Sequence, residues 1–495
     1  MKSARSVPSR SSQDVPSANT VEDDSPPASS FWNLAFAFAL ASIFILHSRL
    51  FDVVANGWKI PRIVLSLMVV FFLLSGRPLT FLRSTTGKFL LALIAWVLVT
   101  VLTSIWRGGS IQSYYLLLQS ALIFVVAASL PLVVRDVERI MTTLALAGLT
   151  AALLSIPFGF NHLARLSLTE GSYYDANLYA LSLASVIPFF WALTAASSSY
   201  VTKIFGWLSV GVILLTVARA GSRGTMLGFV IMVVLLFLIS SVKTKATIIV
   251  STTMGLLIAF ATMPEYIKTR YLTFFEIDSK TAEKIDTPEL SDLEHLHGDT
   301  ASAEERKRLL LASIAITFEH PLFGVGPGNF PTAVYEENNA VGKHSEWLVT
   351  HNSYTEISSE TGLPGLILFL GVIVTSFGSL VSVFRRAREM GDKPDANAYA
   401  MAKYLMLSMT SLCVGVFFLA VGYDCVIYLW AGMAVSLRRA FDTQGVMSQE
   451  AAERPQVFTA QNPVLASAFS KVRNAMPGTK APMIEGKSVR FNRFR

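Results

Sequence analysis

Long apolar stretches separated by short polar connections fill most of the chain. A helix of about 20 residues crosses a hydrocarbon core about 30 Å thick, and most of these stretches approach that length. Their expected limits are 31–47, 60–75, 88–106, 114–134, 140–158, 175–196, 202–218, 224–241, 246–263, 363–384, 400–421 and 424–438. The pattern predicts an all-α polytopic membrane protein with about 12 transmembrane helices.

The composition agrees with lipid as the main solvent of the chain. Hydrophobic residues make up 52% of the sequence and charged residues only 15%, whereas soluble domains carry about 25% charged residues. The net charge of +7 does not indicate a nucleic-acid partner, because Lys and Arg lie between the apolar stretches and form no basic domain. We therefore expect a lipid bilayer as a partner and no nucleic acid.

The orientation follows from the short connections between the spans. If both termini are cytoplasmic, the inner connections hold about twice as many Lys and Arg as the outer ones, in line with the positive-inside rule. We expect residues 1–30 to be a disordered cytoplasmic tail, because they are rich in Ser, Pro and acidic residues. Residues 439–495 are predicted to be a basic, mostly disordered cytoplasmic tail.

One connection is far longer than the others. Residues 264–362 separate the nine helices predicted within 31–263 from the three predicted within 363–438. Successive spans cross the membrane in alternating directions, so with a cytoplasmic N-terminus these residues are expected on the outer side. They hold 17 of the 34 acidic residues and five of the seven histidines. Long ordered loops are usually functional. We expect short helices within this loop, including one with an apolar side over 309–318.

Two motifs stand near the end of that loop. His351-Asn352 is followed after nine residues by Gly362 and then by Gly365. Within it, Ser353 and Glu356 have the spacing of a capping box, which predicts the start of a short helix. Upstream, 320–330 reads HPLFGVGPGNF, with glycines suited to a tight turn rather than to a dinucleotide fingerprint.

The two motifs together resemble those of the O-antigen ligase/polymerase superfamily of bacterial membrane glycan transferases. The pattern H-[NSQ]-x9-G-x-x-G matches fully, and an arginine, Arg306, begins the helix that leads into 320–330. A third shared feature is Ser222-Arg223-Gly224 at the outer start of a span. One departure is Leu310, where the family often has an aromatic residue. The resemblance covers roughly 175–440 and implies an inner-membrane enzyme whose large loop is periplasmic.

The resemblance also implies a glycan donor carried on undecaprenyl diphosphate, and arginine is the natural partner of such a group. Guanidinium is always charged and binds phosphate oxygens in pairs. Arg223 and Arg219 lie on the outer side, against the positive-inside trend. We expect Arg223 and Arg306 to bind the leaving diphosphate, and Arg219 to contribute to substrate binding.

His351 is the candidate general base. Its reference pKa of about 6.5 suits proton transfer near neutral pH, so it can take the proton of an acceptor hydroxyl. Asn352 and Glu356 are candidates to orient it or to contact the substrate, and we add Gly326 and Asn329 of the glycine-rich segment as substrate-binding candidates. We expect no metal ion and no cofactor.

The resemblance implies a metal-independent, inverting glycosyltransferase and leaves its acceptor open. A ligase would pass the glycan to lipid A core, a polymerase would pass it to a growing O-antigen or exopolysaccharide chain, and a third kind of relative passes it to protein. A transporter or flippase of lipid-linked sugar is the alternative from another class. That alternative predicts inverted repeats and charges near the midplane, and the sequence shows no matching halves.

Overall fold

The computed structural model describes residues 30–55, 59–77, 79–162, 165–168, 171–242, 290–340, 347–389 and 396–461, and between 242 and 290 also 245–246, 248–249, 253, 255, 257 and 261. The predicted span 246–263 therefore lies largely outside the described residues. The loop segment 264–289 and the outer parts of both predicted tails also lie outside them.

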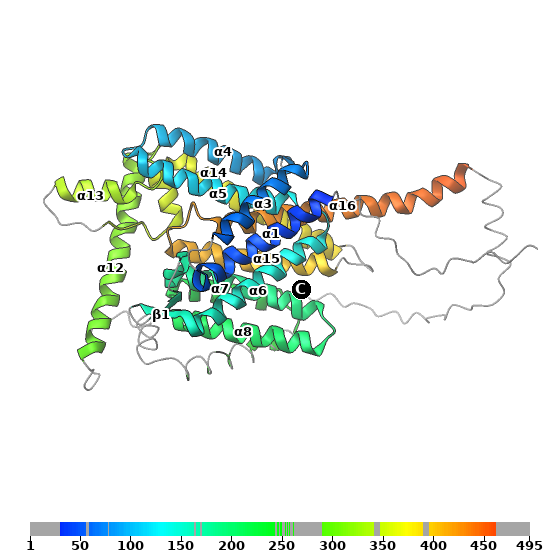
Figure 1. The fold of residues 1–495 in the computed structure, drawn as a ribbon, viewed down its shortest axis with the longest axis horizontal. Helices are drawn as coiled ribbons and strands as arrows, with labels where there is room; N and C mark the ends of the chain where they lie inside the picture. The colour runs from blue at the N-terminus through cyan, green and yellow to red at the C-terminus, as the bar shows by residue number, and fades with distance from the viewer. Residues whose placement is uncertain are drawn as a thin grey trace, which may run out of the picture.

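The helices form a bundle whose axes mostly follow the long direction of the molecule, and α12 crosses one end of it (Figure 1). In chain order the elements are α1 (Ser30–Ser48), α2 (Leu50–Val54), α3 (Ile60–Leu74), η1 (Thr80–Arg83), α4 (Thr85–Leu102), α5 (Arg107–Ser129), α6 (Val134–Phe158), β1 (Gly159–His162), β2 (Arg165–Leu168), η2 (Gly171–Tyr174), α7 (Ala176–Ala196), α8 (Tyr200–Ala220), α9 (Arg223–Ile239), α12 (Leu290–Glu319), α13 (Phe330–Ala340), α14 (Ser353–Glu389), α15 (Ala396–Gly415), η4 (Val416–Phe418) and α16 (Cys425–Gln461).

The predicted class of an all-α polytopic membrane protein is confirmed. Among the described residues, 8 helices are long and apolar enough to cross a membrane, namely α1, α4, α5, α6, α7, α8, α14 and α15. The helices α3 and α9 are apolar but shorter. Helix α16 begins where the last span was predicted and continues to Gln461. The expected number of about twelve spans stays a prediction.

The distribution of side chains is that of a protein in lipid. Large apolar residues lie on the outside, such as Ile156 at 78% exposure and Val374 at 65%. Small hydroxyl residues lie inside, where they join helices: Trp430 donates to the Ser408 hydroxyl at 2.6 Å, and that hydroxyl donates to the Ser185 carbonyl of α7. Small residues at buried interfaces let membrane helices approach closely.

Two features occupy the end of the bundle that α12 crosses (Figure 1). The antiparallel hairpin β1–β2 pairs Gly159 with Leu168 and leads into η2 and α7. This hairpin was not predicted. The helix expected over 309–318 is part of α12, and its buried side chains, with Leu309 and Ile316 among them, pack with Phe330 at the start of α13. The stripe along α12 thus packs α12 against α13 within the loop.

Candidate functional site

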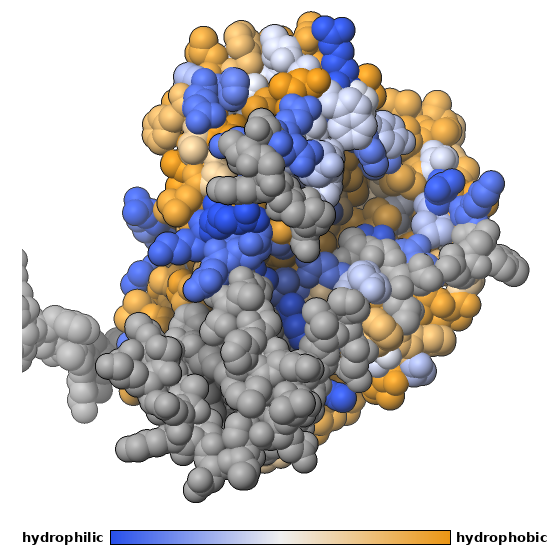
Figure 2. Space-filling model, turned by 90° about the vertical axis from the view of Figure 1, so that its left-hand side faces the viewer, coloured by the Kyte–Doolittle hydropathy of each residue, from blue (hydrophilic) through white to orange (hydrophobic). Residues whose placement is uncertain are grey.

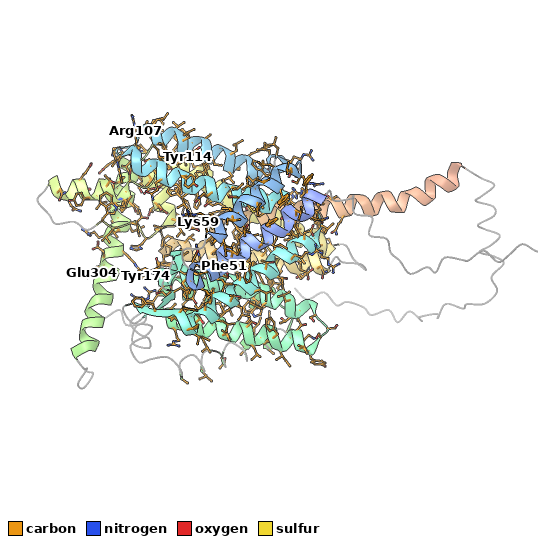
Figure 3. All side chains as sticks on the ribbon, viewed as in Figure 1. Phe51, Lys59, Arg107, Tyr114, Tyr174 and Glu304 are labelled. Carbon is orange, nitrogen blue, oxygen red and sulfur yellow. The ribbon has the colours of Figure 1, made fainter. Side chains whose placement is uncertain are left out.

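Polar side chains gather at this end of the bundle. Figure 3 labels Glu304 of α12, Tyr174 of η2 and Arg107 at the start of α5 there. A view onto the same end shows hydrophilic side chains in the middle of the face and hydrophobic ones toward its rim (Figure 2). Both motifs found in the sequence also lie here, as the contacts below establish.

His351 stands at the turn that opens α14. Its backbone is in the left-handed region with φ 51°, which non-glycine residues adopt uncommonly. The next residue, Asn352, caps the helix, because its side-chain oxygen accepts the N–H groups of Tyr354 at 2.9 Å and Thr355 at 3.2 Å. The turn and the cap together fix the direction in which the His351 side chain leaves the backbone.

The helix starts where the sequence predicted, but its predicted cap is wrong. The hydroxyl of Ser353 donates to the carbonyl of Leu419 at 2.7 Å and accepts the N–H of Val421 at 3.0 Å. Glu356 accepts the N–H of Gly422 at 2.8 Å. Both side chains therefore fasten the connection between α15 and α16 to the first turn of α14, and Asn352 does the capping.

The glycine-rich segment docks on a break in α14. At Gly362 the helical backbone is interrupted, so the carbonyls before the break lose their partners within the helix. The N–H of Val325 binds the carbonyl of Ser359 at 3.0 Å, and the N–H of Gly326 binds that of Glu360 at 2.9 Å. Gly326 has φ 100°, a conformation that favours glycine. The two motifs therefore form one unit.

The break itself requires glycine. Gly362 has φ 74° and ψ 178°, and a β-carbon there would lie 2.0 Å from the carbonyl oxygen of Leu322. We expect Gly362→Ala to cost about 2 kcal/mol of stability or more, seen as a lower thermal-unfolding midpoint of the purified protein. Gly211→Ala is the matched control, because a β-carbon there meets nothing within 4 Å. Equal midpoints for the two variants would contradict this account of the break.

Glu360 ties the unit together, and the sequence analysis missed it. This fully buried carboxylate accepts the N–H groups of Gly328 at 2.6 Å and Phe330 at 3.2 Å, and the hydroxyl of Tyr423 at 2.9 Å. A signal was present in the sequence, since Glu360 lies four residues after Glu356, just before an apolar span. Carboxylates one helical turn apart repel each other, so such a pair beside an apolar span indicates that buried donors stabilise it.

Asn329 is buried beside this unit. Its side-chain amide donates to the hydroxyl of Ser104 at 2.7 Å, the carbonyl of Trp106 at 3.1 Å and the hydroxyl of Ser110 at 3.1 Å. These bonds join the residue before α13 to the connection between α4 and α5 and to the first turn of α5. The observed contacts of Asn329, Gly326, Asn352 and Glu356 all hold loops in place, and substrate binding by these four residues stays a prediction.

His351 and Arg306 lie within electrostatic range of each other. Burial of the imidazole and the nearby positive charge of Arg306 lower the pKa of His351 below its usual 6.5, while the charges of Asp175 and Glu305 oppose this shift. Arg306 lies half-buried on α12, and Asp175 is the N-cap of α7. At neutral pH His351 is therefore uncharged and able to accept a proton.

Arg223 and Arg219 flank the turn between α8 and α9. Arg223 is the half-buried first residue of α9, and Arg219 is exposed in the last turn of α8. A β-carbon on Gly224 would lie 2.6 Å from the ring of Phe418, so α9 begins against η4. Phe418 directly precedes Leu419, which binds the first turn of α14. The turn with Arg223 and the turn with His351 thus both contact the same segment, Phe418-Leu419.

Arg165 of β2 braces the same region and was not singled out as a site residue. Its guanidinium donates to the carbonyl of Ala220 at 3.0 Å and to the side-chain oxygen of Asn177 at 2.6 Å. The hairpin therefore connects the turn between α8 and α9 to the start of α7, where Asp175 lies. An arginine on the outer side, against the positive-inside trend, was the signal that could have found it.

One comparison with known proteins found a match that spans several of these residues. The described helices define a multi-pass membrane protein. Residues 208–370 match the family model described as O-Antigen ligase, and the matched segment contains Arg223, Arg306 and His351. The match confirms the resemblance inferred from the motifs: residues 208–370 are similar to the O-antigen ligase domain of the O-antigen ligase/polymerase superfamily. None of the curated proteins compared with the chain matches it.

Proposed function

We propose that this protein transfers a glycan from undecaprenyl diphosphate to an acceptor hydroxyl at the end of the bundle that holds His351. The observation that carries the proposal is the pairing of a half-buried, uncharged histidine with the nearby cation Arg306. A proton acceptor within electrostatic range of a fixed positive charge suits a reaction that removes a proton from one group while a diphosphate leaves another.

The arginines are assigned to the leaving group. The diphosphate carries at least two negative charges and departs at the boundary of the lipid, where opposite charges attract each other more strongly than in water. In this proposal Arg306 and Arg223 bind the phosphate oxygens of the diphosphate, and Arg219 supplies a third, more exposed cation. Fixed donors directed at developing charge each contribute about 3 kcal/mol to lowering a barrier. In this proposal the arginines neutralise the diphosphate and no metal ion is required.

The reaction proceeds in one displacement. The acceptor hydroxyl gives its proton to an imidazole nitrogen of His351 as its oxygen forms a bond to the anomeric carbon. The bond from that carbon to the diphosphate oxygen breaks, and undecaprenyl diphosphate leaves with the electron pair. Attack opposite to the leaving group inverts the anomeric configuration. The proton then passes from the imidazolium to water, which restores the enzyme.

The charge of Arg306 should appear in the pH dependence of the rate. Because this cation helps to lower the pKa of His351, Arg306→Gln lets that pKa rise toward 6.5. The acid side of the rate profile, where His351 becomes protonated and inactive, then moves to higher pH. The rate on the plateau falls about 100-fold because a diphosphate donor is lost. Single-turnover transfer measured across pH with the purified variant checks both effects.

Lys307→Gln is the matched control, because Lys307 is exposed on the next position of α12. Its profile should coincide with that of the wild type. An acid side that stays in place in Arg306→Gln, or that moves to lower pH, would contradict the assignment of His351 as the base.

The acceptor decides between a ligase and a polymerase, and we propose the ligase reaction. The test mixes purified protein with an undecaprenyl-diphosphate oligosaccharide, with and without lipid A core, and with and without a chelator. We expect glycan on lipid A core in both chelator conditions. Lengthening of the donor glycan in the absence of lipid A core would indicate a polymerase instead. The absence of any product would refute glycan transfer to either acceptor.

A further inference from the structure

A charged cavity lies at the other end of the bundle. It has a volume of about 540 Å³ and is lined by Arg83 of η1, by Ser84 and Thr85 at the start of α4, and by Arg438 and Arg439 of α16. The opposite end of α4 leads to Ser104, which binds Asn329 beside the His351 unit. The length of α4, about 27 Å for 18 residues, therefore separates this basic cavity from the candidate active site.

The positive charge in the basic cavity exceeds the negative charge. Asp442 is the acidic residue among its lining side chains, and it is already shared by Arg386, at 2.5 Å, and Arg438, at 3.7 Å. Arg83 and Arg439 add two further cations to the wall. An excess of guanidinium groups around a space of this size attracts an anion.

Arg439 is held in place by neutral groups. It donates to the hydroxyl of Thr80 at 3.2 Å and to the carbonyls of Ser129 at 3.0 Å and Pro131 at 2.5 Å. These acceptors fix the guanidinium without cancelling its charge. Arg77 also lies within electrostatic range of it. A half-buried cation that is held in place by uncharged partners is costly unless an anion shares the site.

Other donors complete the cavity. Ser84 caps α4, whose first backbone N–H groups lie at the positive end of that helix. The hydroxyls of Thr85, Thr375 and Ser379 also line the space. Guanidinium groups, hydroxyls and a helix start are the donors that proteins use for phosphate oxygens.

We propose that this basic cavity binds the phosphate group of an anionic ligand, as a second site separate from the one that holds His351. A phosphate group could be supplied by the headgroup of an anionic phospholipid or by a free phosphate in solution. Both sources share the chemistry that the cavity recognises. By the distribution of Lys and Arg along the chain, this end is expected to face the cytoplasm.

The test measures binding to the purified full-length protein in detergent by native mass spectrometry. The probes are phosphatidylglycerol, with phosphatidylcholine as the reference for non-specific lipid, and inorganic phosphate as a competitor. The double variant Arg83→Gln/Arg438→Gln removes two cations but keeps Arg439, whose bonds hold α16 in place. Arg135→Gln is the matched control, because Arg135 is exposed at the start of α6 and does not line the cavity.

We expect phosphatidylglycerol to bind more tightly than phosphatidylcholine, and the double variant to raise its Kd at least tenfold. Arg135→Gln should stay within twofold of the wild type. Displacement of the lipid by inorganic phosphate would support a site for any phosphate, and lipid binding that resists displacement would support the headgroup. Equal Kd values for the wild type and the double variant, or no binding of either probe to the wild type, would overturn the proposal.

Discussion

His351→Asn should lower the rate of glycan transfer about 100- to 10,000-fold while the protein still folds. That range is the usual contribution of a positioned general base. Asn is the informative replacement, because His351 has φ 51° and asparagine tolerates the left-handed region better than most residues. The loss of activity then reports the imidazole and not a strained turn. Single-turnover transfer, with thermal unfolding measured in parallel, gives both quantities.

His320→Gln is the control for this prediction. His320 follows α12 in the same loop, and its side chain is exposed. We expect it to transfer glycan within a few-fold of the wild type. A rate for His351→Asn close to that of His320→Gln, in well-folded protein, would remove His351 from the mechanism.

Glu360→Ala should produce the largest loss of stability in the region. The substitution leaves two backbone N–H groups, of Gly328 and Phe330, and the hydroxyl of Tyr423 without their buried acceptor. Each unsatisfied buried donor costs about 1–3 kcal/mol, so we expect a total of about 3 kcal/mol or more. Total stabilities are typically only about 5–15 kcal/mol. The thermal-unfolding midpoint of the purified protein should therefore fall by several degrees.

Tyr423→Phe is the matched control for Glu360→Ala. It removes one of the three donors and leaves Glu360 with its two backbone partners, so a cost of about 1 kcal/mol is expected. If Glu360→Ala unfolded at the same temperature as Tyr423→Phe, the carboxylate would not be the link between the two motifs.

The helices were predictable because lipid imposes their length. The expected spans 31–47 and 202–218 lie within a few residues of α1 and α8, since each must bury about 20 apolar residues and satisfy its own backbone. The sequence also located the unit at the end of the loop. The motif that begins at His351 and the glycine-rich segment were recognised separately, and the structure joins them through backbone hydrogen bonds.

The details that sequence reasoning missed are tertiary contacts. Glu360 binds Gly328, 32 residues away, and Arg165 binds the carbonyl of Ala220, 55 residues away. Hydrophobic periodicity reports only which side of an element is buried, so it contains no signal for such pairs. The cap of α14 was misplaced by one residue because Asn352 and Ser353 are both good capping residues, and the loop beside Leu419 engages the serine instead.

The most direct measurement counts how often the bond between the glycan and undecaprenyl diphosphate is broken. Purified protein in proteoliposomes is given a labelled glycan on undecaprenyl diphosphate together with lipid A core, and both products are counted. We expect one molecule of undecaprenyl diphosphate to be released for each glycan transferred, and almost none with His351→Asn. Movement of the intact lipid-linked glycan across the membrane, with no diphosphate released, would show a transporter and contradict it.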